Sequence, residues 1–282
     1  METRKVQLSG GTTYTVSLPK EWAQEQGIEA GSVLSLRPNG DGSLLVEPTS
    51  GREDEDRSAR IDVSMAEEEA IRQWVRALYA IGYESVTLVD SDGHDAGRRP
   101  IIEETVDGLS GFELLEVTET RIRLTNLVDA ENVDVRKITL RFRLVALAMH
   151  RDAVTAVVED NVDLAEQIIG RDSEADKLFA MVTRYFRRAL SDLQEVEKLN
   201  QSRDELFEYY YTCRQFERIA DHAVKIARFV TDPEAPLPRA FGDQLQQFGF
   251  RARSVIDDAA DVVLADGDVK TAHAALADRD AL

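Results

Sequence analysis

Cysteine is almost absent from this chain of 282 residues, since Cys213 is the only one. A single cysteine excludes an intramolecular disulfide and is typical of proteins in the reducing cell interior. Long apolar runs are also missing, because no stretch approaches the roughly 18 consecutive apolar residues of a membrane-spanning helix. No signal-peptide pattern is present either. The sequence therefore predicts a cytoplasmic protein without membrane insertion.

Lysine is scarce as well, accounting for only 7 of the 34 basic residues, whereas 53 Asp and Glu give a formal net charge of −19. An acidic, arginine-rich surface is typical of proteins that stay soluble at very high salt, so the composition favours a halophilic source. The same acidity disfavours broad non-specific binding to nucleic acid, which depends on basic surface and counterion release.

The first 48 residues show the pattern of a small, strand-rich domain. Alternating apolar residues predict short strands, and Pro19 precedes a short helix. The Asn39–Gly42 stretch is typical of a hairpin turn. The expected elements are strands at 5–8, 14–18, 33–37 and 43–47 and a helix at 20–26, with an acidic linker at 48–58.

Two further segments complete a multidomain α+β chain. Residues 59–130 follow a strand–helix–strand order that predicts a small α+β domain. Residues 133–282 have helical periodicity and predict a C-terminal antiparallel helical bundle, with long helices at 134–160, 164–199, 204–230 and 241–264. A faint similarity between 156–172 and 261–280 predicts one full helical repeat and part of a second.

The segment GTTYTVSLPKEW, residues 11–22, is followed by Gly27-Ile28 and Ala30-Gly31. With its flanking strands, this order resembles the SpoVT/AbrB family of DNA-binding domains, in which two chains interleave hairpins into one swapped-hairpin β-barrel. The resemblance implies a homodimer whose strand–turn regions dock on DNA. The positions of this chain that match the DNA-contacting ones are Arg4, Lys5, Thr12, Thr13, Tyr14 and Lys20.

The charge of this segment leaves a second interpretation open. Residues 1–48 hold 4 Lys and Arg against 6 Asp and Glu, so few phosphates can be neutralised by each chain. Dimerisation doubles that number, and hydroxyl and backbone N–H groups add contacts. The alternative is a barrel that only dimerises the protein.

Two segments of the helical part, DLAEQIIGRDSEADKL (163–178) and FERIADHAVKIA (216–227), resemble the PhoU family of phosphate-uptake regulators. That family repeats a three-helix unit and binds metal through acid-x-x-x-acid motifs. The resemblance implies a divalent or iron-type ion (Fe, Mn, Mg or Zn) held by Asp172, Asp176, Glu217 and Asp221. The second repeat lacks its metal motif, and Lys225 stands where the family usually has asparagine, so a second subunit would have to supply the missing half.

The position of these acids on their helices leaves two possible counter-charges. Glu217 falls inside the apolar stripe of its helix and Asp221 lies at the edge, so both need a cation to offset their desolvation. Oxygen-rich ligands suit Mg, Mn or Fe better than a structural zinc. The alternative is an ion-pair edge, with Asp221 paired to Lys225 and Glu217 paired to an arginine.

An AbrB-like head joined to a PhoU-like body resembles fused regulators of archaea. The combination predicts a DNA-binding transcriptional regulator that acts at promoters of phosphate-uptake genes, with a body that senses a metal or a partner. The alternative is a signalling adaptor that acts on a phosphate transporter or another regulator protein and uses the barrel only to dimerise. We expect no enzyme, since no Ser–His or Cys–His pairing and no phosphate-cradling glycine loop is visible.

Overall fold

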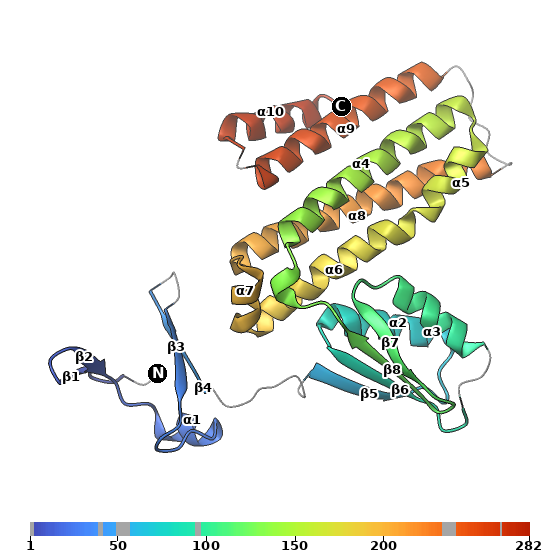
Figure 1. Ribbon diagram of the computed structural model, residues 1–282. Coiled ribbons are helices and arrows are strands. Elements are labelled where there is room, and N and C mark those ends of the chain that lie inside the picture. Colours follow the sequence, from blue (N-terminus) through green and yellow to red (C-terminus); the bar gives the residue numbers. More distant parts are fainter. Residues whose placement is uncertain (1–2, 39–41, 49–56, 94–96, 233–240, 266) are drawn as a thin grey trace. The chain divides into compact units, whose positions relative to one another are not determined.

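The computed structural model describes residues 3–38, 42–48, 57–93, 97–232, 241–265 and 267–282. The chain divides into two compact units, Met1–Asp56 and Arg57–Leu282 (Figure 1). Most of the predicted linker and most of the predicted Asn39–Gly42 turn lie outside the described residues.

The N-terminal unit consists of two separate hairpins and one short helix, with no closed barrel among the described residues of this single chain. Strand β1 pairs antiparallel with β2, with Leu8 opposite Tyr14. Gly10 and Gly11 in the connecting turn have φ of +63° and +81°, which glycine adopts without strain. The elements are β1 (Gln7–Ser9), β2 (Thr13–Thr15), α1 (Lys20–Glu25), β3 (Leu34–Pro38) and β4 (Leu44–Pro48), the last two paired antiparallel.

The larger unit begins with an α+β layer built on a four-stranded sheet of order β5-β6-β8-β7. Strand β5 runs parallel to β6, and the other neighbours are antiparallel. Alternation of buried and exposed residues places one sheet face in a core with the layer's helices. The elements are β5 (Ser58–Asp62), α2 (Glu68–Ile81), β6 (Ser85–Val89), α3 (Arg98–Asp107), β7 (Phe112–Val117) and β8 (Arg121–Asn126).

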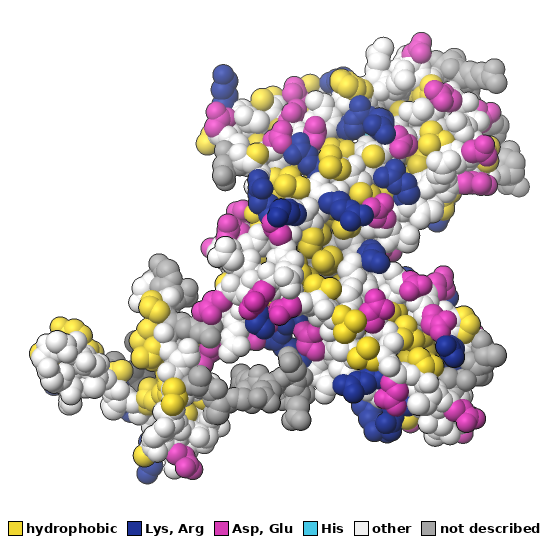
Figure 2. Space-filling view, viewed as in Figure 1, with side chains coloured by type: hydrophobic (Ala, Val, Ile, Leu, Met, Phe, Trp, Pro, Cys, Tyr) yellow, Lys and Arg dark blue, Asp and Glu magenta, His cyan; other side chains and the backbone are white. Residues whose placement is uncertain are grey.

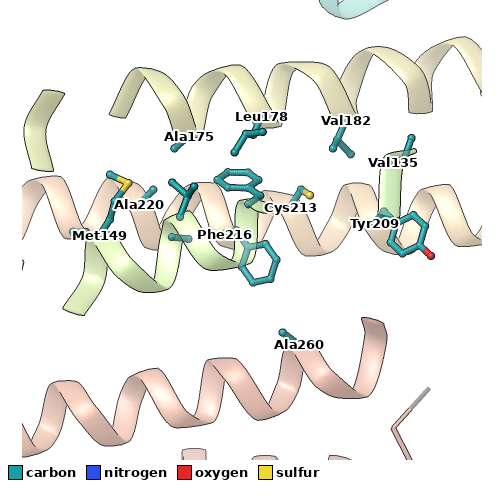
Figure 3. Packing of buried hydrophobic residues seen from close by; sticks show 14 of the residues in the cluster. Val135, Met149, Ala175, Leu178, Val182, Tyr209, Cys213, Phe216, Ala220 and Ala260 are labelled. Carbon is teal, nitrogen blue, oxygen red and sulfur yellow. The ribbon is translucent and has the colours of Figure 1, made fainter. Parts of the chain in front are cut away.

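The second layer is helical and has its own core. Helices α4 (Val135–Glu159), α6 (Asp172–Ser191) and α8 (Arg203–Thr231) pack against one another. Figure 3 shows side chains of all three meeting, among them Met149, Ala175 and Phe216. The remaining helices are the short turn η2 (Ala130–Asn132), α5 (Val162–Gly170), α7 (Leu193–Leu199), α9 (Gly242–Leu264), which packs on α4, and α10 (Val269–Asp280), which packs on α9.

The prediction of one continuous helix at 164–199 is wrong, because the structure divides this stretch into α5, α6 and α7. Asp192 causes the second break: its backbone is extended, and its side chain accepts a hydrogen bond from the Gln194 N–H as an N-cap. At the first break, Arg171 stays helical and ends α5 while α6 begins. Apolar spacing alone does not reveal such helix ends, because the spacing continues across them.

Among the described residues, no helix is long and apolar enough to cross a lipid bilayer.

A buried arginine joins the two layers of the larger unit. Arg184 of α6 is fully buried and donates to the carbonyl oxygens of Tyr79 and Tyr83, at 2.8 and 2.9 Å. Its guanidinium carbon lies 5.0 Å from the centroid of the Tyr79 ring and 5.4 Å from that of Phe112. Its charge is met by Glu84, 3.2 Å away. The end of α2 is therefore fixed to α6 by hydrogen bonds, charge and ring contacts together.

A glycine at the end of α2 makes room for a second contact with α6, one turn beyond Arg184. Gly82 ends α2 with φ of +106°, and a Cβ atom there would lie 2.6 Å from Cγ of Arg188. Arg188 pairs with Glu84 and donates to Glu195 at 2.7 Å. Gly82 is thus required both by the left-handed helix end and by the close approach of Arg188.

We predict that Arg184→Met destabilises the protein by about 3 kcal/mol, because it leaves two buried carbonyls without their donor and removes one cation from Glu84. Urea unfolding followed by circular dichroism measures the change in stability. Arg187→Met, at an exposed position of the same helix, is the matched control and should change stability by less than about 0.5 kcal/mol. Equal stability of the two variants would show that the Arg184 contacts do not hold the layers together.

Candidate functional site

The residues predicted to contact DNA are all exposed in the N-terminal unit. Arg4 and Lys5 precede β1, Thr12 lies in the turn, and Thr13 and Tyr14 belong to β2. The sixth residue, Lys20, is the first residue of α1. Exposure leaves every one of these side chains accessible to a ligand.

The hairpin does not bring these residues into one cluster within a single chain. Ser9 pairs with Thr13 next to the turn, whereas Lys5 lies four residues before Ser9. At about 3.4 Å of rise per residue, four residues of extended chain separate Lys5 from Thr13 by roughly 14 Å along the hairpin. Within one chain, the basic residues before β1 and the hydroxyl groups near the turn therefore lie apart.

The N-terminal unit has no core of its own, because no residue described between 3 and 48 is buried. Large apolar side chains lie on the surface instead, with Tyr14 75% exposed (Figure 2). A folded segment normally buries such side chains, so their exposure makes this surface available for contact with another surface. The exposed apolar residues are Val6, Leu8, Tyr14, Val16, Val33, Leu36 and Leu44.

The four predicted metal ligands lie along the contact between α6 and α8. Asp172 and Asp176 are in the first two turns of α6, and Glu217 and Asp221 are in the middle of α8. Ala175 and Ala220, next to two of these acids, are buried in the core of this contact (Figure 3). Packing of the two helices thus places both acid pairs at the edge of one core, as helical spacing predicts for the acids on each helix.

The carboxylates are close enough to repel one another. Burial raises the pKa of Glu217, and the negative charge of Asp221 raises it further. Burial also raises the pKa of Asp172, with Asp176 and Asp221 adding to the effect. Burial raises the pKa of Asp176 as well, and the negative charge of Asp221 adds to this effect. We call Asp172, Asp176, Glu217 and Asp221 the acid cluster.

Arginines offset part of this negative charge. Arg214 lies 3.9 Å from Glu217, at the limit of an ion pair, and its positive charge lowers the pKa of that carboxyl. The positive charge of Arg228 lowers the pKa of Asp172, and that of Arg76 lowers the pKa of Asp176. The predicted ion pair between Asp221 and Lys225 is absent from the described residues, so only the Glu217–arginine part of the ion-pair alternative has a counterpart in the structure.

One oxygen of the cluster accepts no hydrogen bond. Glu217 Oε2 is buried, and no described residue donates a hydrogen bond to it, although Arg214 Nη1 lies 3.9 Å away. A carboxylate oxygen without a hydrogen bond among acids suits a hard cation, for which such oxygens are the preferred ligands. However, no group of three or more Asp, Glu, His or Cys side chains in the described part of the chain converges on one point in a metal-binding arrangement. The carboxylate oxygens are suitable ligands for a cation, but the side chains would have to move closer together to coordinate it.

The arginine network around Glu84 is the feature that sequence reasoning missed. The sequence does not distinguish three charged residues of this network from the exposed charged residues of other helices. All three are nevertheless buried: Arg184, Arg188 and Glu195. The available signal was an arginine on the apolar face of the helix at 172–191, but sequence spacing does not identify its partners. Cys213 is buried as expected of a small apolar residue, and burial raises the pKa of its thiol to about 12.

Models of known protein families match one segment in each unit. A family model described as PhoU domain matches residues 139–230, which span α4 to α8 and include all four acids. A second model, described as antidote-toxin recognition MazE, bacterial antitoxin, matches residues 7–54. The chain joins a MazE/AbrB-like domain to a PhoU domain. No curated protein and no solved structure shows significant similarity to it.

These matches confirm the two resemblances on which the sequence prediction rested. The PhoU domain coincides with the three packed helices and leaves α9 and α10 outside the match. The α+β layer between the two matched segments belongs to neither of them.

The raised pKa values of the acid cluster predict a pH-dependent stability. Glu217, with an ordinary pKa of 4.5, holds its proton more tightly in the folded than in the unfolded state, so the free energy of unfolding falls as pH rises above that value. We predict that Glu217→Gln removes part of this decline and raises the thermal midpoint at pH 7. Thermal unfolding between pH 4 and pH 8 measures both effects.

Glu208→Gln, at an exposed position of the same helix, is the control and should keep the pH dependence of the unchanged protein. A Glu217→Gln variant that is less stable at pH 7 would show that the carboxylate makes a favourable contact there, contrary to the raised pKa.

Proposed function

We propose that this protein is a dimeric DNA-binding regulator of phosphate uptake, with a PhoU body that senses a metal ion or a protein partner. One observation carries the proposal: a MazE/AbrB-like domain whose hairpins expose their apolar side chains is joined to a PhoU domain. The first feature supports dimerisation and DNA binding, and the second supports a role in phosphate-related regulation.

The dimer forms, in this proposal, by interleaving the hairpins of two N-terminal units into one swapped-hairpin barrel. Leu8 and Tyr14 lie opposite each other on β1 and β2, so one partner surface covers both. Arg4, Lys5 and Lys20 of both copies then supply the cations for phosphate contacts, while Thr12, Thr13 and Tyr14 present hydroxyl groups. The DNA partner is the promoter region of phosphate-uptake genes.

The acid cluster is the site that we propose for a cation. Two observations support it: a Glu217 oxygen that accepts no hydrogen bond, and the mutual repulsion of Glu217, Asp172 and Asp176. A divalent or iron-type ion would relieve both. Such an ion would supply positive charge at the α6–α8 contact and hold the two helices together. A second subunit can complete the ligand set that one PhoU repeat provides.

The adaptor function has an observation in its favour and is the second candidate. The first 48 residues carry more acidic than basic residues, which weakens attraction to DNA. In this alternative the barrel only dimerises the chain, and the PhoU domain contacts a phosphate transporter or another regulator. The two candidates differ in whether DNA binds selectively.

Neither candidate includes a catalytic step. Cys213 is buried with a strongly raised pKa, which makes its thiol a poor nucleophile. A cytoplasmic, halophilic and archaeal setting stays a prediction from composition and resemblance, and the assays therefore extend to molar salt.

We expect selective binding to DNA from phosphate-uptake promoters over scrambled DNA. Arg4→Ala/Lys5→Ala should weaken it and reduce the slope of log affinity against log salt by about one unit for each DNA phosphate that the variant no longer neutralises. Fluorescence anisotropy with labelled duplexes measures both quantities. Arg218→Ala/Lys225→Ala removes the same charge from exposed positions of α8 and should leave the slope unchanged. Equal binding to both DNAs would move the function to the adaptor.

We predict that the purified protein binds Mn²⁺ or Fe²⁺ stoichiometrically and that Glu217→Gln/Asp221→Asn abolishes this binding. Elemental analysis after dialysis against the metal counts the bound ions. Asp204→Asn/Glu208→Gln is the matched control, since these acids have the same spacing on α8 and are exposed. Full metal content in the Glu217/Asp221 variant would refute the site.

A further inference from the structure

An open cleft of about 860 Å³ lies between the two layers of the larger unit. Residues of α2 and α3 form one wall, and residues of α4 and α6 form the other; the chain between α3 and β7 adds Gly108 and Ser110. Ligand pockets for small molecules have volumes of about 300–1,000 Å³. The cleft is therefore of the size that a small metabolite needs.

The cleft combines an apolar part with polar walls. Ile138, Leu178 and Met181 supply the apolar surface, and the remaining lining is mainly charged. This combination is typical of sites that bury the carbon skeleton of a ligand and fix its polar end. A bare inorganic ion would use only part of such a surface.

Most of the charged groups of the cleft are already paired. Arg72 pairs with Glu104 within the α2–α3 wall, and Arg141 pairs with Glu174 within the α4–α6 wall, each at 2.8 Å. The charges within each pair cancel. They do not provide the charge that selects a ligand.

Two cations remain outside these pairs, one on each wall. Lys177 of α6 donates to the backbone oxygen of Asp107 at 2.8 Å, so its charge meets a neutral acceptor and two of its N–H donors stay available. Arg76 of α2 is exposed and makes no hydrogen bond or ion pair with the described residues. Asp107 is the one carboxylate of the lining that no ion pair of the described residues neutralises.

We propose that this cleft binds a phosphorylated small molecule, with Arg76 and Lys177 on opposite walls holding the phosphate group. Against the one unpaired carboxylate, Asp107, these two cations leave an excess of positive charge for a phosphate group, which carries about −1.5 to −2 at neutral pH. The guanidinium of Arg76 presents a planar fork of donors that fits phosphate oxygens, and Lys177 adds a point charge. The alternative of a cation in the cleft is disfavoured, because the lining holds four Lys and Arg against three Asp and Glu.

The site also connects with the acid cluster. Asp176 precedes Lys177 in α6, and the charge of Arg76 acts on Asp176. A phosphate group bound by Arg76 therefore competes with Asp176 for this arginine. The site lies wholly within Arg57–Leu282, so the proposal does not depend on DNA binding by the N-terminal unit.

Isothermal titration calorimetry of the full chain with glucose 6-phosphate, inorganic phosphate and glucose, at fixed ionic strength and without divalent metal, tests the proposal. We expect glucose 6-phosphate to bind and glucose not to bind. Arg76→Ala and Lys177→Ala should each weaken binding at least about tenfold. Asp176→Asn should tighten it, because the competitor for Arg76 is removed.

Arg187→Ala, which removes an exposed cation of α6 outside the cleft, is the control and should bind like the unchanged protein. Arg76 makes no hydrogen bond with the described residues, so Arg76→Ala should stay folded, with the circular dichroism spectrum of the unchanged protein. Binding of inorganic phosphate alone would support the site and identify free phosphate as its ligand. Absence of binding by both phosphate compounds, or equal affinity of the Arg76→Ala variant, would overturn the proposal.

Discussion

The contact of Arg184 with the end of α2 is the constraint on which the larger unit depends. A buried guanidinium is costly unless its charge and its donors find partners. Here Glu84 faces the charge, two carbonyl oxygens accept from Nη1 and two aromatic rings lie nearby, while Nε and Nη2 make no hydrogen bond with the described residues. These partners exist only when α6 lies against α2. The arginine therefore fixes the position of one layer relative to the other more strictly than apolar contacts alone would, since apolar contacts tolerate sliding.

The position of α6 has consequences for both proposed ligand sites. Its buried residues belong to the helical core, Ala180 packs on the core of the α+β layer, and its first two turns carry Asp172, Asp176 and Lys177. Two of these are members of the acid cluster, and the third lines the cleft. A helix held at one end by Arg184 and Arg188 presents these groups at the other end in a fixed geometry, which is what binding sites need.

Local patterns in the sequence predict much of this architecture, because each depends on neighbours in the chain. Helical spacing placed Glu217 inside the apolar stripe of its helix and Asp221 at the edge, and the Pro19 and glycine signals marked the short elements of the N-terminal unit. Relations between distant residues were not predictable in the same way. Arg184 and Tyr79 are 105 residues apart, and nothing in the spacing of either identifies the other. The cleft could not be predicted for the same reason, because Arg76 and Lys177 line one cleft only after α2 packs on α6.

The acid cluster and the cleft also influence each other through Arg76. When the cluster is empty, the charge of Arg76 partly offsets that of Asp176. In the proposed function, a cation bound by the acids would take over this role and leave the charge of Arg76 to a phosphate group. The cation would then favour the anion, and by thermodynamic reciprocity the anion would favour the cation by the same factor. The α6–α8 contact would thus be tightest when both ligands are present, which gives the PhoU body a direct way to report their joint concentration.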